Sequence, residues 1–416
     1  MAYNFPEGEK KILKFWEDSK IFEKSLEQTK GKKPFVFYDG PPFATGTPHY
    51  GHLLQSVIKD AIPRYKTMQG FYVARQWGWD CHGLPIENIV EKELGTKSKK
   101  DIVEMGVKKF NDLCRQQIFT FIEEWERVIP RFGRWVDMKN PYRTMDFEYM
   151  QSEWWAFKEL YDKGLIYEDY RSMHICPRCE TTLSQGEVAE GYKTIKDLSV
   201  TAKFAIVGQP NTFILAWTTT PWTLPGNVAL AVGADIEYVK AKVGDQIYIV
   251  AKSRVGEVFK DKPYEILETV TGKDLVGLQY QSLFDYYSKD QNLKNRENGW
   301  KVYSADFVTT EDGTGIVHIA PAFGTDDMLL GKEKNLPFVQ HVKMDGTFKP
   351  EVADFAGVDL KPRAKDKPEE IREADLSVVK FLEVKGLVFS YEKYVHSYPH
   401  CWRCDTPLLN YATSSW

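Results

Sequence analysis

The sequence has little net charge, few cysteines and no long apolar run. Its 416 residues carry a formal net charge of −4, so we do not expect a general polyanion binder, and any nucleic-acid contact must come from a local patch. Charged residues interrupt the N-terminal segment every few positions, and no stretch approaches a membrane span. We therefore expect a cytoplasmic protein with no membrane partner.

Cysteine is scarce, but four of the six cysteines form two CxxC units, Cys176/Cys179 and Cys401/Cys404. In a reducing compartment such units indicate metal or redox chemistry rather than a disulfide framework. The redox alternative lacks the helix start that activates a reactive cysteine, so we favour one tetrahedral zinc site built from all four side chains. The long segment between the units would then be an insertion clipped together at its base.

The composition is that of a globular chain with more than one core. Hydrophobic residues make up 43% and aromatic residues 14% of the sequence, which favours two or more domains. From about residue 195 to 345, short alternating segments predict a β-rich domain. From about 100 to 170 the pattern is helical, with aromatic residues that we expect in the core. These aromatic residues are Trp125, Trp135, Trp154, Trp155, Phe157 and Tyr161.

The N-terminal region predicts a strand–helix–strand unit. Residues 33–38 and 70–76 predict short strands, and the apolar stripe between them predicts a helix that Pro63 should kink or shorten. Such a unit is expected to be parallel and right-handed, as in half of a nucleotide-binding sheet. The residues expected to face inward are Ile12 and Trp16 of a first helix over 8–19, and Leu53, Leu54, Val57, Ile58, Ala61, Ile62 and Tyr65 of the second.

A glycine- and proline-rich turn with two histidines precedes the second predicted helix. A metal site is a weak interpretation of His49 and His52, because no acidic or cysteine ligands lie nearby. Helix N-termini present backbone N–H groups, and Gly46 and Gly51 allow a ligand to approach the backbone closely. Imidazoles at this position can donate hydrogen bonds to phosphate oxygens. The pattern therefore favours a phosphate-binding turn.

Three other segments contain candidate site residues. Asp80 follows the second predicted strand, where open α/β sheets bind ligands, although a turn-capping aspartate fits equally well. Residues 217–227 contain three consecutive threonines, which are also good strand formers. Residues 313–327 contain His318 and an acidic pair, which favours a small polar pocket. Neither segment has a nucleophile elbow, so we do not expect a covalent hydrolase.

Four motifs together resemble the isoleucyl-tRNA synthetases among the class I aminoacyl-tRNA synthetases. They are FYDGPPFATGTPHYGH, whose PHYGH resembles the HIGH signature, GWDCHGLPIE, WTTTPWTLPGN and GTGIVHIAPAFGTDD. The resemblance implies an α/β fold: the first half of a class I Rossmann-type nucleotide-binding domain, an inserted β-rich editing domain and a zinc knuckle at the junction. The implied limits are 1–175 for the half-domain, 176–194 for the first zinc-bearing stalk, 195–385 for the editing domain and 386–416 for the return stalk.

The resemblance also implies a synthetic site in the first domain. His49 and His52, with Gly51, would hold the phosphates of ATP, which acts with Mg. Gly40 and Pro41 would hold the isoleucine side chain, and Asp80 its α-ammonium. The implied partners are ATP, isoleucine and the acceptor end of tRNA(Ile), bound by a monomer, with zinc as the metal.

In the inserted domain the resemblance implies an editing pocket for the aminoacylated 3′ end. Thr218, Thr219, Thr220 and Asn227 would line it, with His318 beside it and Asp327 gripping the substrate ammonium. Hydrolysis would follow from positioning a water against the ester, without a metal or covalent intermediate. A second site is needed because valine lacks only one methylene, a difference worth roughly 1–3 kcal/mol, for which these enzymes are themselves the standard example.

The end of the chain departs from the family pattern. The sequence stops at NYATSSW, before the KMSKS loop, the second half of the nucleotide-binding fold and the anticodon-binding helices. We therefore expect an N-terminal fragment that keeps the editing domain but lacks half of the ATP site. Two alternatives remain open: a valyl- or leucyl-specific relative, and a non-catalytic RNA-binding module whose zinc knuckles grip the acceptor stem.

Overall fold

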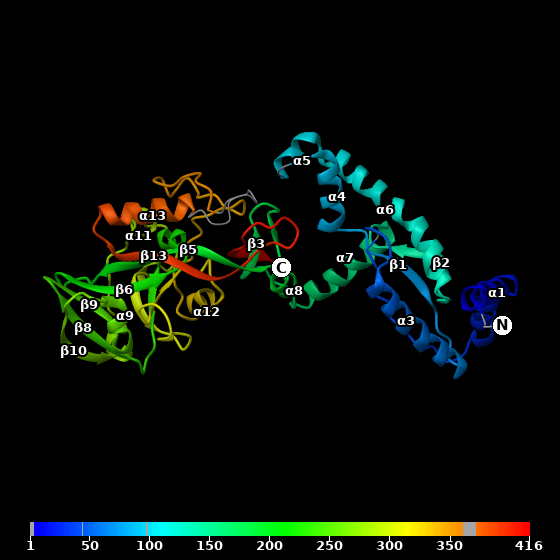
Figure 1. The fold of residues 1–416 in the computed structure, drawn as a ribbon, viewed down its shortest axis with the longest axis horizontal. Helices are drawn as coiled ribbons and strands as arrows, with labels where there is room; N and C mark the ends of the chain where they lie inside the picture. Colours follow the sequence, from blue (N-terminus) through cyan, green and yellow to red (C-terminus); the bar gives the residue numbers. More distant parts are fainter. Residues whose placement is uncertain (1–3, 44, 97–98, 361–371) are drawn as a thin grey trace. The chain divides into compact units, whose positions relative to one another are not determined.

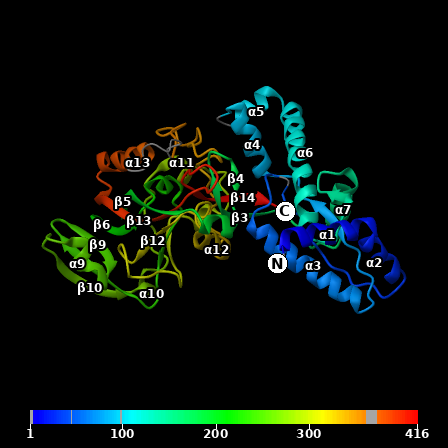
Figure 2. The same ribbon diagram turned by 45° about the vertical axis from the view of Figure 1, so that its right-hand side comes forward.

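The structure is a computed structural model that describes residues 4–43, 45–96, 99–360 and 372–416. The chain forms two compact units, residues 1–167 and 168–416, and Figures 1 and 2 show the elements of each. Both contain helices and strands, so the predicted mixed α/β class is confirmed. No helix within the described ranges is both long and apolar enough to cross a membrane.

The first unit packs helices against a small parallel sheet. Strands β1 (Gln76–Trp79) and β2 (Asp137–Arg143) pair in parallel. Helix α6 places an apolar residue inward at every third or fourth position, from Phe110 to Ile129, as expected for a helix buried along one stripe. Trp125 of this stripe packs against Trp77 and Trp79 of β1. The helices are α1 (Phe5–Asp18), α2 (Ile21–Thr29), α3 (Tyr50–Met68), α4 (Leu84–Leu94), α5 (Lys99–Met105), α6 (Val107–Arg131) and α7 (Phe147–Asp162).

The predicted strand over 33–38 is wrong. Only Pro34 forms a parallel bridge, to Tyr72, while Val36 and Tyr38 are 69% and 93% exposed. Parallel strands are stable when both faces are covered, and one face of this segment is open to solvent. The second predicted strand is displaced, because β1 begins only at Gln76.

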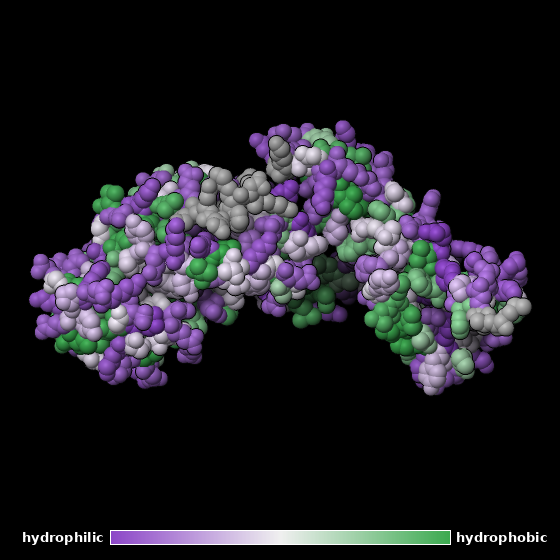
Figure 3. Space-filling model, viewed as in Figure 1, coloured by the Kyte–Doolittle hydropathy of each residue, from purple (hydrophilic) through white to green (hydrophobic). Residues whose placement is uncertain are grey.

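The helix after this segment forms, but its predicted inward stripe does not. Helix α3 continues past Pro63, whose carbonyl accepts a hydrogen bond from Thr67 Oγ1 at 2.8 Å, so the proline does not shorten it. Periodicity shows that a helix has an apolar face but not that a partner covers it. Figure 3 shows apolar surface over α3. The residues predicted inward but found exposed are Leu54, Val57, Ile58, Ala61, Ile62 and Tyr65 of α3, Ile12 of α1, and Trp154, Trp155, Phe157 and Tyr161 of α7.

The second unit is built on a six-stranded sheet of order β10-β8-β9-β6-β5-β13. Strand β5 (Tyr192–Ala205) leads into this sheet, and β13 (Val388–Pro399) runs back antiparallel beside it. The pairing extends from Val388 opposite Ala202 to Pro399 opposite Tyr192. The sheet accounts for the predicted β-rich texture and places the two ends of the long intervening segment next to each other.

Two smaller sheets complete the second unit, in the orders β11-β7-β12 and β14-β3-β4. Strand β12 pairs antiparallel with β7, so residues 316–319 are fixed against residues 229–232. The strands are β3 (Asp169–Cys176), β4 (Thr181–Thr182), β6 (Thr212–Thr218), β7 (Ala229–Val232), β8 (Glu237–Val243), β9 (Gln246–Ala251), β10 (Glu265–Thr271), β11 (Lys301–Ser304), β12 (Ile316–Ile319) and β14 (Leu409–Ser415). The helices are α8 (Gln185–Ala189), α9 (Val255–Phe259), α10 (Gly272–Leu275), α11 (Asp285–Ser288), α12 (Thr325–Glu333) and α13 (Glu373–Val384), with 3-10 turns η1 (Pro221–Gly226), η2 (Lys252–Arg254) and η3 (Arg296–Asn298).

Gly78 of β1 allows the close packing between β1 and β2 in the first unit to be tested. A Cβ at this position would lie 2.1 Å from the Tyr142 ring, whose hydroxyl donates to the Asp39 carbonyl at 3.2 Å. We expect Gly78→Ala to lower the free energy of unfolding by about 1–3 kcal/mol through overpacking. Gly186→Ala in α8 is the control, because a Cβ there meets no atom within 4 Å. Urea unfolding followed by circular dichroism measures both, and equal effects would contradict the expectation.

Candidate functional site

His49 and His52 interlock at the start of α3. His49 is the N-cap, and its Nδ1 accepts from the Gly51 N–H at 3.1 Å. His52 Nδ1 in turn accepts from the His49 N–H at 3.2 Å, and the two rings stack with centroids 3.7 Å apart. Imidazole nitrogens therefore occupy two of the backbone N–H groups that the sequence suggested for a ligand.

The same contacts set the donor atoms of both rings. Because each Nδ1 accepts a hydrogen bond, the proton of each neutral ring is assigned to Nε2, which is left to donate. Burial, and then the nearby His49 and Lys59, lower the pKa of His52, which favours its neutral form. The Trp125 ring packs edge-on against the His52 ring, with the two ring centroids 4.8 Å apart. The pair is thus a rigid platform with outward hydrogen-bond donors.

The structure brings the turn at Gly40 and Pro41 next to Asp80. The Asp80 N–H donates to the Pro42 carbonyl at 2.9 Å, and Phe43 forms a parallel bridge with Asp80. Asp80 is half-buried, and burial raises its pKa while hydrogen bonds from the backbone of His82 and Cys81 oppose that rise. A carboxyl group beside a proline-rich turn can pair with a cation while the turn contacts an apolar group.

The second unit contains a cavity of about 330 Å³ lined by most of the predicted pocket residues. Thr218 Oγ1 lies 3.1 Å from Thr220 Oγ1 and accepts from the Thr220 N–H at 3.1 Å, so the threonine hydroxyls form one chain. Trp217 and Phe323 supply apolar wall, and the close approach of Gly313 to the Trp217 ring leaves no room for a side chain there. The predicted residues that line the cavity are Thr218, Thr219, Thr220, His318 and Asp327.

His318 is oriented by partners on both ring nitrogens. Its Nδ1 lies 3.5 Å from Asn227 Nδ2 and its Nε2 2.8 Å from Thr223 Oγ1. Since the amide nitrogen can only donate, Nδ1 accepts and Nε2 carries the proton. Thr223 Oγ1 accepts from that Nε2–H and donates its own hydrogen bond to the Thr220 carbonyl at 2.8 Å. Burial lowers the pKa of His318 to about 4, so the ring is neutral at pH 7. His318 therefore orients Thr223, and Asn227, which does not line the cavity, orients the His318 ring.

Asp327 brings a carboxyl group to the cavity from the first turn of α12. Its Oδ2 accepts from the Ala320 N–H at 3.1 Å, and Gly324 leaves room for the carboxyl because a Cβ there would lie 2.8 Å from its Cγ. Burial raises the pKa of Asp327 to about 7, against the hydrogen bond from Ala320. Pairing with a cation would recover the cost of ionising this group.

The four CxxC cysteines converge, as predicted. The Sγ atoms of Cys176, Cys179, Cys401 and Cys404 all lie within 4.8 Å of one another. Cys404 Sγ is 3.4 Å from Cys176 Sγ and 3.7 Å from Cys179 Sγ. A tetrahedral zinc ion with Zn–S bonds of about 2.3 Å separates its sulfurs by about 3.8 Å, which matches this spacing. The other two cysteines, Cys81 and Cys114, are buried in the first unit.

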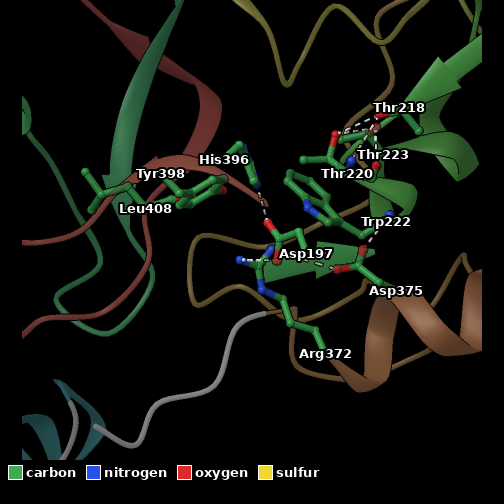
Figure 4. Close-up of polar contacts among 10 residues, drawn as sticks. All are labelled: Asp197, Thr218, Thr220, Trp222, Thr223, Arg372, Asp375, His396, Tyr398 and Leu408. Atoms are coloured by element: carbon green, nitrogen blue, oxygen red, sulfur yellow. Dashed lines mark hydrogen bonds and ion pairs between the residues drawn. The ribbon is translucent and has the colours of Figure 1, made fainter. Parts of the chain in front are cut away.

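Three residues that hold the turn at 218–227 were not predicted from the sequence. Thr223 lies within the WTTTPWTLPGN motif, and the 3-10 turn that begins at Pro221 brings its hydroxyl back toward Thr220. Asp375 and His341 hydrogen-bond to the backbone of Trp222 from far along the chain, and no local pattern indicated them. Figure 4 shows Asp375 beside Trp222, with the threonine hydroxyls close by.

The sequence matches the profile of the tRNA synthetases class I (I, L, M and V) over residues 11–402. It is 44% identical over 443 residues to an isoleucine–tRNA ligase of Treponema denticola, which covers 99% of this chain and 39% of that protein. It is 46% identical over 417 residues to one of Bdellovibrio bacteriovorus, covering 99% and 38%. Against isoleucine–tRNA ligase 2 of Pseudomonas fluorescens the identity is 48% over 414 residues, again covering 99% and 38%.

The chain therefore spans about two fifths of the length of these relatives. The profile match extends over most of the sequence and includes the His49, Asp80, Thr218 and His318 motifs. The predicted family resemblance is thus confirmed. This chain belongs to the class I tRNA synthetases of the isoleucine, leucine, methionine and valine group.

Proposed function

We propose that this chain is part of an isoleucine–tRNA ligase and that its second unit hydrolyses mischarged valyl-tRNA(Ile). The similar proteins that carry the name isoleucine–tRNA ligase support the choice of amino acid over the valyl and leucyl alternatives. The observation that carries the editing activity is a single cavity lined by three consecutive threonines and by the carboxyl-bearing Asp327. It also disfavours a purely RNA-binding module, because phosphate binding alone does not need a half-buried carboxyl group.

The editing proposal assigns each group a task. Asp327 pairs with the α-ammonium of the aminoacyl ester, because its carboxyl lines the cavity and the Ala320 N–H holds its Oδ2 in place. The hydroxyls of Thr218, Thr219 and Thr220 hold the terminal ribose and a water near the ester carbonyl. His318 and Asn227 keep Thr223 and Thr220 oriented. The isoleucyl ester is excluded because its additional methylene does not fit beside the apolar wall.

The synthetic proposal concerns the first unit. The Nε2–H groups of His49 and His52, beside Gly51, donate to the phosphates of ATP, which supplies the activating chemistry together with Mg. Asp80 holds the isoleucine ammonium, and Gly40 and Pro41 contact its side chain. The proposed editing domain spans 195–385, between a first stalk at 176–194 and a return stalk at 386–416.

We also propose that Cys176, Cys179, Cys401 and Cys404 hold zinc. The spacing of their sulfurs supports this, as does the small apolar cluster that Cys176 and Cys401 form with Leu183, Val188 and Leu408. Zinc in such a closed site is structural: it would join the CxxC unit that precedes β5 to the CxxC unit that follows β13.

The proposed editing activity predicts selective ester hydrolysis. Incubated with this chain, valyl-tRNA(Ile) should release its amino acid faster than isoleucyl-tRNA(Ile). Asp327→Ala should slow the release at least about tenfold, because it removes a charge-assisted hydrogen bond worth about 1.5–3 kcal/mol. The matched control is Asp326→Ala, since Asp326 is adjacent but exposed and outside the cavity lining. Equal losses in both variants, or no hydrolysis by the unaltered chain, would count against the editing proposal.

The raised pKa of Asp327 predicts a pH-dependent stability. The folded chain holds this proton up to pH about 7, whereas an unfolded aspartate loses it near 3.8. Between these values the folded state binds more protons, so the free energy of unfolding should fall as pH rises from about 4 to 7 and level off above. Asp327→Asn should reduce that fall in urea titrations. Asp326→Asn should reduce the fall much less, because the nearby charge of Asp326 contributes less than burial to the raised pKa of Asp327. An identical slope in all three proteins would contradict the assignment.

The zinc proposal predicts a loss of bound metal with a loss of stability. Purified chain should contain about one zinc per molecule, measured by atomic absorption, and Cys404→Ser should remove it and lower the unfolding temperature. Cys114→Ser, a buried cysteine of the first unit, should retain the zinc. Full zinc content in Cys404→Ser would show that this residue is not a ligand.

A further inference from the structure

Two buried side chains hold the backbone of Trp222 in turn η1. The Trp222 N–H donates to Asp375 Oδ1 at 3.1 Å, and its carbonyl accepts from His341 Nε2 at 2.8 Å. Asp375 and His341 are 1% and 0% exposed. One belongs to α13 and the other to the loop after α12, so two distant parts of the chain hold a single residue of the turn.

His341 fits the turn at two points. Its Nε2 carries a proton because it donates to a carbonyl, and burial lowers its pKa to about 3, so the ring stays neutral. Its Nδ1 lies against Gly226, where a Cβ would come within 2.4 Å. The Phe323 ring, which also lines the cavity, packs on the His341 ring with centroids 4.6 Å apart. His341 therefore connects the end of the turn to the wall of the cavity.

Asp375 is itself oriented by buried charges. Arg372 pairs with Asp197 of β5 at 2.9 Å and lies 3.8 Å from the second oxygen of Asp375. His396 of β13 binds the other oxygen of Asp197 at 3.0 Å. Figure 4 shows this chain of contacts running from His396 through Asp197 and Arg372 to Asp375 and Trp222. The carboxyl that meets the Trp222 N–H is thus tied to both strands at the base of the unit.

Trp222 lies between Thr220 and Thr223, whose hydroxyls belong to the proposed site. Thr223 Oγ1 contacts His318, and Thr220 Oγ1 contacts Thr218. A shift of the Trp222 backbone would move both hydroxyls together, and small displacements of positioning groups reduce the fraction of substrate in reactive geometry. The turn has few hydrogen bonds of its own, because its two prolines, Pro221 and Pro225, cannot donate from the backbone, so contacts from outside add to its stability.

We propose that Asp375 and His341 are positioning residues for ester hydrolysis in the cavity. They fix both backbone polar groups of Trp222 and thereby the spacing of Thr220 and Thr223. This inference rests on the proposed editing function, but its structural part can be tested without it. Neither residue lines the cavity, so neither is expected to touch substrate.

The test compares Asp375→Ala, which removes the acceptor for the Trp222 N–H, with Asp375→Asn, which retains an oxygen there but no charge. Asp274→Ala is the destabilising control, because Asp274 binds the N–H and hydroxyl of Thr271 at the start of α10 and is outside the cavity lining. The same pair of changes at His341, to Ala and to Gln, separates loss of the donor from loss of the ring. Each variant is assayed at a temperature at which it is fully folded by circular dichroism.

Two measurements are made on the full chain: kcat and KM for valyl-tRNA(Ile) hydrolysis, and hydrogen exchange of the amides in 218–227. For Asp375→Ala we expect about a tenfold or greater loss of kcat with KM within about threefold, and faster exchange in 218–227, as for a lost buried hydrogen bond. Asp375→Asn and His341→Gln should retain most of the kcat and most of the exchange protection that the alanine variants lose. Asp274→Ala should change neither.

The outcomes separate the two proposals. If the unaltered chain hydrolyses no ester, the editing proposal fails, while faster exchange in Asp375→Ala than in Asp375→Asn would still support the holding of the turn. Unchanged exchange in 218–227 for both alanine variants would overturn the positioning role. The positioning role would also be overturned if Asp375→Asn lost as much kcat as Asp375→Ala. The same holds if Asp274→Ala lowered kcat, or sped up exchange in 218–227, as much as the Asp375→Ala or His341→Ala variant.

Discussion

The antiparallel pairing of β5 with β13 is the contact on which the rest of the second unit depends. It brings Tyr192 opposite Pro399, so the CxxC units just outside the two strands meet with their sulfurs within 4.8 Å. The same pairing places His396 beside Asp197. Asp197 pairs with Arg372, which lies near Asp375, and Asp375 accepts a hydrogen bond from Trp222 in the turn η1. A strand pair thus links the cysteine cluster at its base to the cavity of the unit.

The cavity combines hydroxyl groups with titratable groups that are both shifted toward neutrality. Burial lowers the pKa of His318 to about 4 and raises that of Asp327 to about 7. An empty site therefore avoids burying a lone charge, which would be costly. A cationic ligand reverses the balance at Asp327, because its charge favours the carboxylate. Such a site is suited to a substrate that brings its own ammonium group.

Much of the candidate site was predictable because its residues lie in short motifs. The WTTTPWTLPGN and GTGIVHIAPAFGTDD segments place Thr218, Thr219, Thr220, His318 and Asp327 around one cavity, as the resemblance implied. The first unit was less predictable. The apolar pattern of α3 predicted a helix correctly, but six residues of its stripe are exposed, and the segment over 33–38 forms one bridge rather than a strand. Periodicity reports a face, whereas burial depends on a partner surface that the local sequence does not encode.

The sequence by itself determined the family, the β-rich middle of the chain, the cysteines that meet and most of the polar residues of the cavity, since each depends on residue types at short spacing. Only the tertiary structure decided how those residues are held. Asp375 and His341 reach Trp222 from distant segments, and the ring proton of His318 follows from Asn227 and Thr223, which are also far away in the sequence. The physical reason is that hydrogen-bond direction and burial are properties of the surroundings of a group, and folding alone assembles those surroundings.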